Sequence, residues 1–214
     1  MTNWEKETQK LDSLEVAPFE LSSEHIKELK KACATAKKKQ KDFNFHLAGH
    51  LQEEYRIDPL PQNVTRDLIT VTNHETFDYY KKKSSYLSKD CPYYMDRMWC
   101  NYQKKYEFNP IHTHAGLFSF VIFLKIPYNL KNEDNYFVKT AANKDQDKLA
   151  SRFSFLNVHP KEAGGVRTTA INVDKSFEGK GFMFKAKQQH MVYPFYTSDK
   201  YRITVSGNIK LYTG

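Results

Sequence analysis

The stretch that decides the fold is Phe118-Ser119-Phe120-Val121-Ile122-Phe123-Leu124, in which every residue but one is apolar. Aromatic and β-branched side chains favour extended backbone, so this run predicts a strand in a rigid sheet. Comparable runs occur from about residue 95 onward, at 98–102, 153–158, 167–173, 182–185 and 202–211. Turn signals rich in glycine or small polar residues lie between several of them, at 164–165, 178–181 and 197–200. The second half of the chain is therefore predicted to consist of short strands.

The first half of the chain has the sequence pattern of helices rather than of strands. Ser22 and Ser23 are suited to cap a helix that runs to about Lys41, with apolar or small residues at helical spacing. After a proline break at 59–61, residues 63–83 predict a second helix. Helices followed by many short strands predict an α+β fold with a sandwich or jelly-roll core. The polar segment 129–149 lacks a clear period and is predicted to be a long loop or a lid.

Length and composition narrow the class of protein. The 214 residues are enough for one well-buried domain. We expect a polar N-terminal arm over residues 1–20 and a single domain over 21–214, with its helical part at about 21–90 and its jelly-roll core at about 95–214. No apolar run reaches the roughly 20 residues of a membrane helix, and the N-terminus has no signal-peptide pattern. The three cysteines form no CxxC pair, which argues against a disulfide framework or a zinc knuckle. We expect a soluble, cytoplasmic protein.

The chain is basic, with 33 lysines and arginines against 25 acidic residues and a formal charge of +8. Much of the charge lies in short runs, at 37–41, 81–83 and 104–105. Such a charge attracts phosphate or other acidic partners. A solvated face is the simpler interpretation of each run, and no nucleic-acid-binding motif accompanies them. Nucleic acid is therefore an open but unsupported partner.

The residues that point to chemistry are His112 and His114, which precede the apolar run. Side chains at positions i and i+2 of an extended segment project to the same face, so both imidazoles can meet one metal ion without backbone strain. The alternative is that they are two unrelated surface histidines. A third histidine, His190, follows the predicted strand at 182–185, and Arg202 opens the last strand twelve residues later. The other five histidines are assigned to surface or structural roles.

This order of motifs resembles the Fe(II)/2-oxoglutarate-dependent dioxygenases, in which a His-X-Asp or His-X-Glu pair precedes a distant histidine and then an arginine. The resemblance is closest to phage-type 2-oxoglutarate/Fe(II) oxygenases. It covers about Phe43 to Leu211 and is carried by four motifs in order: Leu47-Ala48-Gly49-His50, Trp99-Cys100-Asn101-Tyr102, Asn109-Pro110-Ile111-His112-Thr113-His114 with the following apolar run, and His190-Met191-Val192-Tyr193-Pro194-Phe195 with Tyr201-Arg202-Ile203-Thr204-Val205-Ser206-Gly207-Asn208.

The resemblance implies a double-stranded β-helix with Fe(II) near its open end and 2-oxoglutarate as cosubstrate. It makes His112 the first iron ligand and His190 the last, and it assigns Arg202 to the distal carboxylate of 2-oxoglutarate. Physical chemistry agrees, because neutral imidazoles suit Fe(II) and a guanidinium forms a bidentate pair with a carboxylate. Thr204 lies two residues further along the same strand, and its hydroxyl is a second candidate donor to that carboxylate. Further candidates for 2-oxoglutarate contact are Tyr102, Tyr106 and Lys125, whereas Trp99 is assigned to the core.

One position departs from the family pattern, because His114 stands where the carboxylate ligand is expected and no Asp or Glu lies between Glu107 and Asn132. Three interpretations stay open. His114 itself binds iron and gives a three-histidine site; His114 points away and leaves a position to water or halide; or the site has lost metal and activity. Same-face geometry favours the first.

The leading hypothesis is an Fe(II)- and 2-oxoglutarate-dependent hydroxylase that also takes O2 and an unidentified primary substrate. The alternatives are an inactive jelly-roll module with a binding or structural role, and a basic nucleic-acid-binding protein. The predicted location is the cytoplasm, or the host-cell cytoplasm if the protein is viral. The sequence does not identify the primary substrate or the oligomeric state.

Overall fold

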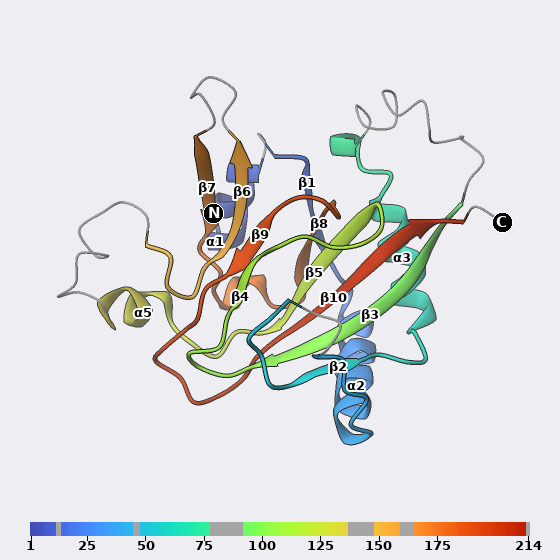
Figure 1. Ribbon diagram of the computed structural model, residues 1–214, viewed down its shortest axis with the longest axis horizontal. Helices are drawn as coiled ribbons and strands as arrows, with labels where there is room; N and C mark the ends of the chain where they lie inside the picture. Colours follow the sequence, from blue (N-terminus) through green and yellow to red (C-terminus); the bar gives the residue numbers. More distant parts are fainter. Residues whose placement is uncertain (12–13, 45–47, 78–91, 137–147, 159–164, 213–214) are drawn as a thin grey trace.

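The computed structural model describes residues 1–11, 14–44, 48–77, 92–136, 148–158 and 165–212, and two antiparallel sheets face each other in it (Figure 1). In order across the larger sheet, the strands are β1 (Val16–Glu20), β8 (Lys180–Lys185), β5 (Phe118–Lys125), β10 (Arg202–Leu211), β3 (Tyr93–Gln103) and β2 (Glu54–Arg56). The smaller sheet has the order β4 (Asn109–His112), β9 (His190–Val192), β6 (Phe153–Val158) and β7 (Val166–Ile171). Paired antiparallel sheets of this kind confirm the α+β, jelly-roll prediction.

The apolar run lies in β5, in the interior of the larger sheet between β8 and β10. Alternate side chains of β5 enter two different cores, which explains why the run is apolar at nearly every position. Phe118, Phe120, Ile122 and Leu124 pack in a cluster with the helices, and Val121 and Phe123 pack in a second cluster with β6 and β8. Burial on both faces fixes the register of the sheet.

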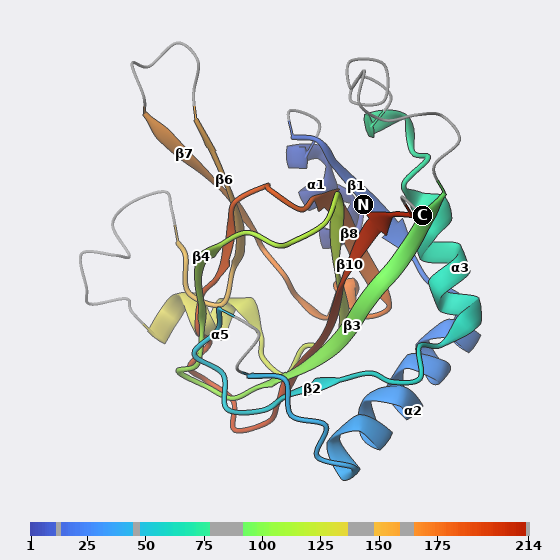
Figure 2. The same ribbon diagram turned by 45° about the vertical axis from the view of Figure 1, so that its right-hand side comes forward.

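The helices at 23–38 and 62–71 cover the outer face of the larger sheet, opposite the smaller sheet (Figure 2). Helix α2 (Ser23–Lys38) begins where the sequence predicts, because the Ser22 hydroxyl accepts a hydrogen bond from the His25 N–H. Helix α3 (Gln62–Val71) ends well before residue 83, and a short 3-10 turn (Glu75–Phe77) follows it; residues 78–83 of the predicted helix lie outside the described part. No helix in the described ranges is long and apolar enough to cross a membrane.

The segment at 1–20, expected to be a polar arm, contains regular elements in the described part of the chain. Helix α1 (Asn3–Thr8) and a 3-10 turn (Gln9–Leu11) lead into β1, which pairs with β8 along its whole length. Trp4 is buried and stacks on Phe182 with ring centroids 5.3 Å apart. Pro18 made this segment a poor strand candidate in the sequence, but an edge strand tolerates proline because one of its sides has no partner. We propose that the domain includes residues 1–20.

Other short elements escaped the sequence analysis. Strands β1, β2, β4 and β9 have three to five residues each, too few to show a period. The predicted loop or lid at 129–149 begins with helix α5 (Leu130–Tyr136), and its residues 137–147 lie outside the described part. Glu133 in this helix is buried and accepts hydrogen bonds from the N–H groups of Tyr196 and Thr197. The start of the segment is therefore anchored to the chain that follows β9.

If the N-terminal segment is part of the core, Trp4→Ala will lower the free energy of unfolding by about 3–5 kcal/mol, because it deletes a buried indole between two phenylalanine rings. Urea denaturation followed by far-UV circular dichroism measures the change. Val166→Ala is the control, since Val166 is 61% exposed and its truncation is expected to change stability by less than about 0.5 kcal/mol. Equal free energies of unfolding for the Trp4 variant and the wild type would instead support a detached N-terminal arm.

Candidate functional site

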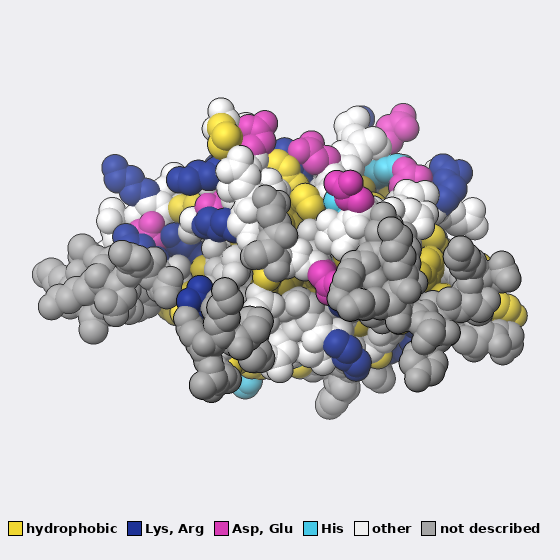
Figure 3. All heavy atoms as spheres, turned by 90° about the horizontal axis from the view of Figure 1, so that it is seen from above, with side chains coloured by type: hydrophobic (Ala, Val, Ile, Leu, Met, Phe, Trp, Pro, Cys, Tyr) yellow, Lys and Arg dark blue, Asp and Glu magenta, His cyan; other side chains and the backbone are white. Residues whose placement is uncertain are grey.

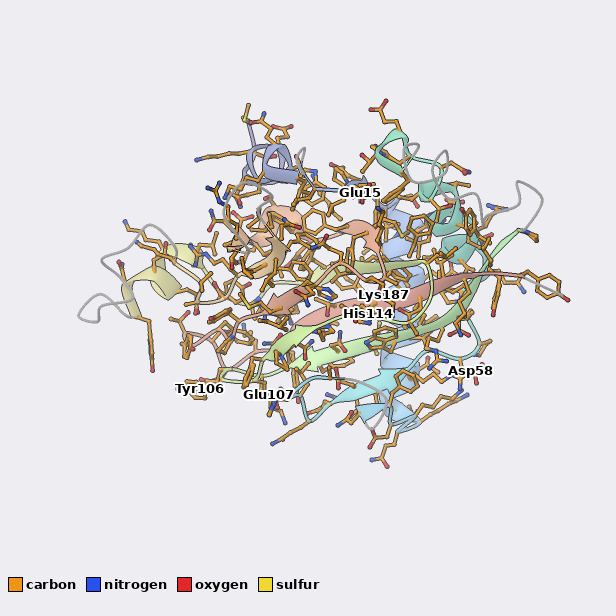
Figure 4. All side chains as sticks on the ribbon, turned by 45° about the horizontal axis from the view of Figure 1, so that its top comes forward. Glu15, Asp58, Tyr106, Glu107, His114 and Lys187 are labelled. Atoms are coloured by element: carbon orange, nitrogen blue, oxygen red, sulfur yellow. The ribbon has the colours of Figure 1, made fainter. Side chains whose placement is uncertain are left out.

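The smaller sheet brings the three predicted histidines together. His112 ends β4 and lies opposite His190, the first residue of β9, in the antiparallel register. His114 follows β4 by two residues, and its backbone N–H donates to the Ala186 carbonyl at 2.7 Å. The candidate ligand nitrogens of all three residues lie within 4.8 Å of one another. Figure 4 shows His114 over the middle of the sheets, away from Tyr106, Glu107 and Asp58 at the rim.

Backbone carbonyls fix the orientation of two of the three rings. The Nδ1 atom of His112 lies 2.7 Å from the Pro110 carbonyl oxygen, and the Nδ1 atom of His190 lies 2.9 Å from the Gln188 carbonyl oxygen. Each contact assigns the proton to Nδ1, which leaves the Nε2 lone pair free for a cation. Carbonyls in this position raise the basicity of a ligating imidazole and hold its plane. The sequence analysis did not find these carbonyls, although each lies two residues before its histidine.

The surroundings of the histidines keep the imidazoles neutral. The pKa of each imidazole is lowered, that of His114 to about 3 and that of His190 well below its ordinary value, and burial is the main cause. The neighbouring imidazoles contribute to the lowered pKa of His114 and His190, because two positive charges repel each other at this distance. Phe153 and Phe184 pack against the His190 ring, with centroids 5.6 Å and 4.8 Å away. Neutral imidazoles present lone pairs at neutral pH, as metal ligation requires.

The spacing of the nitrogens fits a divalent transition metal. The Nε2 atoms of His114 and His190 lie 3.1 Å apart. Two ligands at right angles on a metal, each with a bond of about 2.1 Å, are separated by about 3.0 Å. A metal ion bound by both nitrogens fits this separation, as does a hydrogen bond from the His114 Nε2–H to His190 in the metal-free protein. His114 therefore lies with the other two histidines and does not turn away from them.

The fourth predicted site residue, Arg202, lies in the same cavity, which has a volume of about 210 Å³. Its side chain is buried, and each of its five N–H groups has an acceptor, namely the Gln103 amide oxygen twice, the Tyr128 hydroxyl and the carbonyls of Ser151 and Tyr193. All of these acceptors are neutral. Within the described part of the chain, no carboxylate forms an ion pair with Arg202. A buried cation without a counter-ion is costly, so the site is suited to an anionic ligand.

Thr204 also lines the cavity, and its hydroxyl accepts from the Asn101 amide at 3.0 Å. Trp99, assigned to the core from the sequence, lines the cavity too, and its ring lies 5.6 Å from that of His114. The three residues predicted as further 2-oxoglutarate contacts, Tyr102, Tyr106 and Lys125, are absent from the lining. Gln103 and Tyr128 were missed. Alternation along β3 carries Gln103 to the same face as Trp99 and Asn101, whereas Tyr128 lies beyond β5, where no period applies.

The comparisons with known proteins agree with this site. The model of a family described as "Putative 2OG-Fe(II) oxygenase" matches residues 97–208, more than half of the chain. Two solved structures are similar. One is a prolyl-4-hydroxylase from Pseudomonas putida, with a TM-score of 0.52 and 10% identity; the match covers 96% of this chain and 97% of that chain. The other is an oxidoreductase of the 2OG-Fe(II) oxygenase family from Burkholderia pseudomallei, with a TM-score of 0.51 and 11% identity; the match covers 100% of this chain and 92% of that chain. No curated protein matches the chain significantly.

At such low identity the two structures speak for the fold alone, and the family match speaks for the enzyme class. Nothing in these matches bears on the phage-type assignment, which stays a prediction. The expected cofactors, Fe(II) and 2-oxoglutarate, are those of the matched family. On the family match across 97–208, the chain belongs to the 2-oxoglutarate- and Fe(II)-dependent oxygenases.

Proposed function

We propose that this oxygenase is a hydroxylase in which His112, His114 and His190 hold Fe(II) and Arg202 binds 2-oxoglutarate. The balanced reaction is 2-oxoglutarate plus O2 plus R–H to succinate plus CO2 plus R–OH. The observation that carries the proposal is that Arg202, which has no carboxylate partner among the described residues, is buried in the cavity that also contains the three histidines. One ligand that chelates a metal at one end and carries a carboxylate at the other satisfies both features.

The histidines of the chain would bind the metal, and the metal when bound supplies the activation of O2. Their part is to offer three neutral nitrogens from a fixed frame, because Pro110 and Gln188 hold two of the rings. Phe153 and Phe184 exclude water from the side of His190, which protects a reactive centre from side reactions. Three neutral ligands leave both charges of the metal to be balanced by dianionic 2-oxoglutarate, so cosubstrate and metal binding should support each other.

Arg202 is suited to the distal carboxylate, because the uncharged amide oxygen of Gln103 already occupies the position on the guanidinium where a carboxylate would bind. The Gln103 Oε1 atom accepts from Nε and Nη2 of Arg202 at 2.9 and 2.7 Å, which is the side of a guanidinium that a carboxylate bridges. We infer that the incoming carboxylate displaces this amide. The Tyr128 hydroxyl accepts from Nη1 at 3.1 Å and donates to the Ser151 carbonyl, so it holds the other side of the guanidinium, whereas Thr204 in the cavity lining is a candidate donor to the carboxylate.

The runner-up, a nucleic-acid-binding protein, has less support. In the view of Figure 3, lysine and arginine side chains are interspersed with aspartate and glutamate, and the described residues on that face form no continuous basic stripe. Several lysines are paired with acidic side chains, among them Lys37 with Glu53 and Lys105 with Asp199. The lysines and arginines described on that face are thus not gathered into the basic stripe typical of a nucleic-acid-binding surface.

The metal site is tested by Co(II) titration of the metal-free protein, followed by visible absorption. We expect one equivalent to bind to the wild type. Disturbing an outer-sphere partner of a metal ligand lowers metal affinity roughly 10–100-fold. His114→Ala and His190→Ala each remove a direct ligand, so each should lower the affinity for Co(II) by more than that. His25→Ala is the control, since His25 lies on α2 beside Asp67. Unchanged affinity in His114→Ala would favour a two-histidine site with an open position.

The role of Arg202 is tested by comparing 2-oxoglutarate with pyruvate, which has the keto acid but lacks the distal carboxylate. Anaerobic titration of the Fe(II) protein, followed by the charge-transfer absorption of the chelate, gives both affinities. Arg202→Gln should weaken 2-oxoglutarate by about 3–5 kcal/mol, more than a hundredfold, and leave pyruvate nearly unchanged. The pyruvate result shows that the variant is folded. A wild-type preference that survives in the variant would remove Arg202 from the cosubstrate site.

A further inference from the structure

Some buried side-chain oxygen atoms have no hydrogen-bond donor among the described residues of the protein. Three of these atoms belong to residues that line the cavity: Oε2 of Glu54, Oδ1 of Asn101 and Oδ1 of Asn109. A buried acceptor without a donor costs free energy, so the donor is expected to arrive with a ligand. The Asn101 oxygen is the least informative, because the Thr204 hydroxyl can bond to either end of that amide. The oxygen atoms of Glu54 and Asn109 are therefore the two that indicate a missing ligand.

Glu54 is an unusual residue for this position. It opens the edge strand β2, opposite Asn101 of β3, and only 2% of it is exposed. Burial and, to a smaller extent, the carboxylates of Glu107 and Asp42 together raise the pKa of Glu54 to about 8. The charged groups that bear on Glu54 from its surroundings are thus acidic. The two arginines of the lining have other partners, since Arg97 pairs with Asp96 and Arg202 with neutral oxygens.

Asn109 brings a second acceptor close to the metal site. It begins β4, three residues before His112. Its Oδ1 atom lies so close to the chain at Gly49 that a Cβ atom there would be 2.1 Å away. The backbone at Gly49 therefore packs directly against the Asn109 amide and holds it in place, while no donor reaches the oxygen. The amide is positioned without being satisfied.

We propose that Glu54 and Asn109 bind the primary substrate through a cationic group, an alkylammonium or a guanidinium. The inference rests on the proposed hydroxylase function and names the substrate class of the same cavity. A cation supplies several N–H donors to both oxygens and gains from the acidic neighbours of Glu54. A neutral amide could donate to both oxygens but would gain nothing from the negative charges of Asp42 and Glu107. The site is distinct from that of 2-oxoglutarate, because β2 lies two strands from β10, roughly 10 Å across the sheet.

Binding of a cation should be linked to proton release. In the free protein at pH 7, a carboxyl with a pKa of about 8 is mostly protonated, and contact with a cation favours the ionised form. Close to one proton, about 0.9, is therefore released on binding at pH 7, and only about 0.1 at pH 9. Affinity should rise about tenfold between pH 7 and pH 9, because a lysine ammonium stays charged up to about pH 10.

The test uses the Fe(II)- and 2-oxoglutarate-loaded protein under anaerobic conditions and isothermal calorimetry with two probes, Nα-acetyl-lysine amide and its uncharged analogue Nα-acetyl-norleucine amide. We expect the lysine probe to bind at least roughly tenfold more tightly than the norleucine probe, with proton release at pH 7 measured from the dependence of the heat on the buffer. Equal affinities, or proton release that does not depend on pH, would overturn the inference even without any variant.

Two variants test whether Glu54 is the residue that binds the lysine probe. Glu54→Gln keeps the shape of the side chain and should weaken the lysine probe roughly ten- to hundredfold and abolish the proton release. Glu53→Gln is the matched control, because it removes the same charge from the preceding residue, whose carboxylate instead contacts Lys37 and Tyr201 outside the cavity lining. Loss of 2-oxoglutarate affinity in Glu54→Gln, with lysine affinity unchanged, would reassign Glu54 to the cosubstrate and refute the cation site.

The outcomes for the inference and for the proposed function are separable. If the wild type fails to bind 2-oxoglutarate, the hydroxylase proposal fails first. If it binds 2-oxoglutarate normally but does not distinguish the lysine probe from the norleucine probe, only the cation site fails.

Discussion

The antiparallel pairing of β4 with β9 sets His112 opposite His190, and the two-residue extension to His114 completes a group of imidazoles in a buried cavity. Everything else in the site depends on this pairing. The sheet holds the backbone, the carbonyls of Pro110 and Gln188 hold the rings, and burial keeps the rings neutral. Such a frame costs stability, because one buried and two half-buried polar rings replace apolar packing, and a bound cation would offset that cost.

The larger sheet supplies the charged and polar side chains that line the cavity opposite the histidines. Its inner face is apolar at β5 and β8 and becomes polar at β10, β3 and β2, where Arg202, Asn101 and Glu54 line the cavity. A buried cation on β10 and a buried acid on β2 are separated by β3. This arrangement distributes charge across one cavity, so that two ligands of opposite charge can occupy it together. The smaller sheet, with the histidines, closes the cavity from the other side.

Much of this site could be predicted from the sequence, because its residues belong to strands with a clear period. The spacing of His112 and His114 and the step from Arg202 to Thr204 both rely on the alternation of side chains along a strand. Glu54 could not be predicted, since its burial depends on a three-residue edge strand that pairs with β3 from a distance of more than 40 residues. Tyr128 was missed for a related reason, because only the tertiary fold brings its hydroxyl to Arg202. The sequence showed no strand at 16–20, because Pro18 and its acidic neighbours concealed a short edge strand.

The central claim is that three histidines, without a carboxylate, form the iron site. X-ray absorption spectroscopy of the Fe(II)-loaded protein measures it most directly, because multiple scattering from imidazole rings counts the histidine ligands. The account predicts three imidazoles per iron, with bonds near 2.1 Å. Two imidazoles with a shell of oxygen ligands, or iron without imidazole scattering, would contradict it.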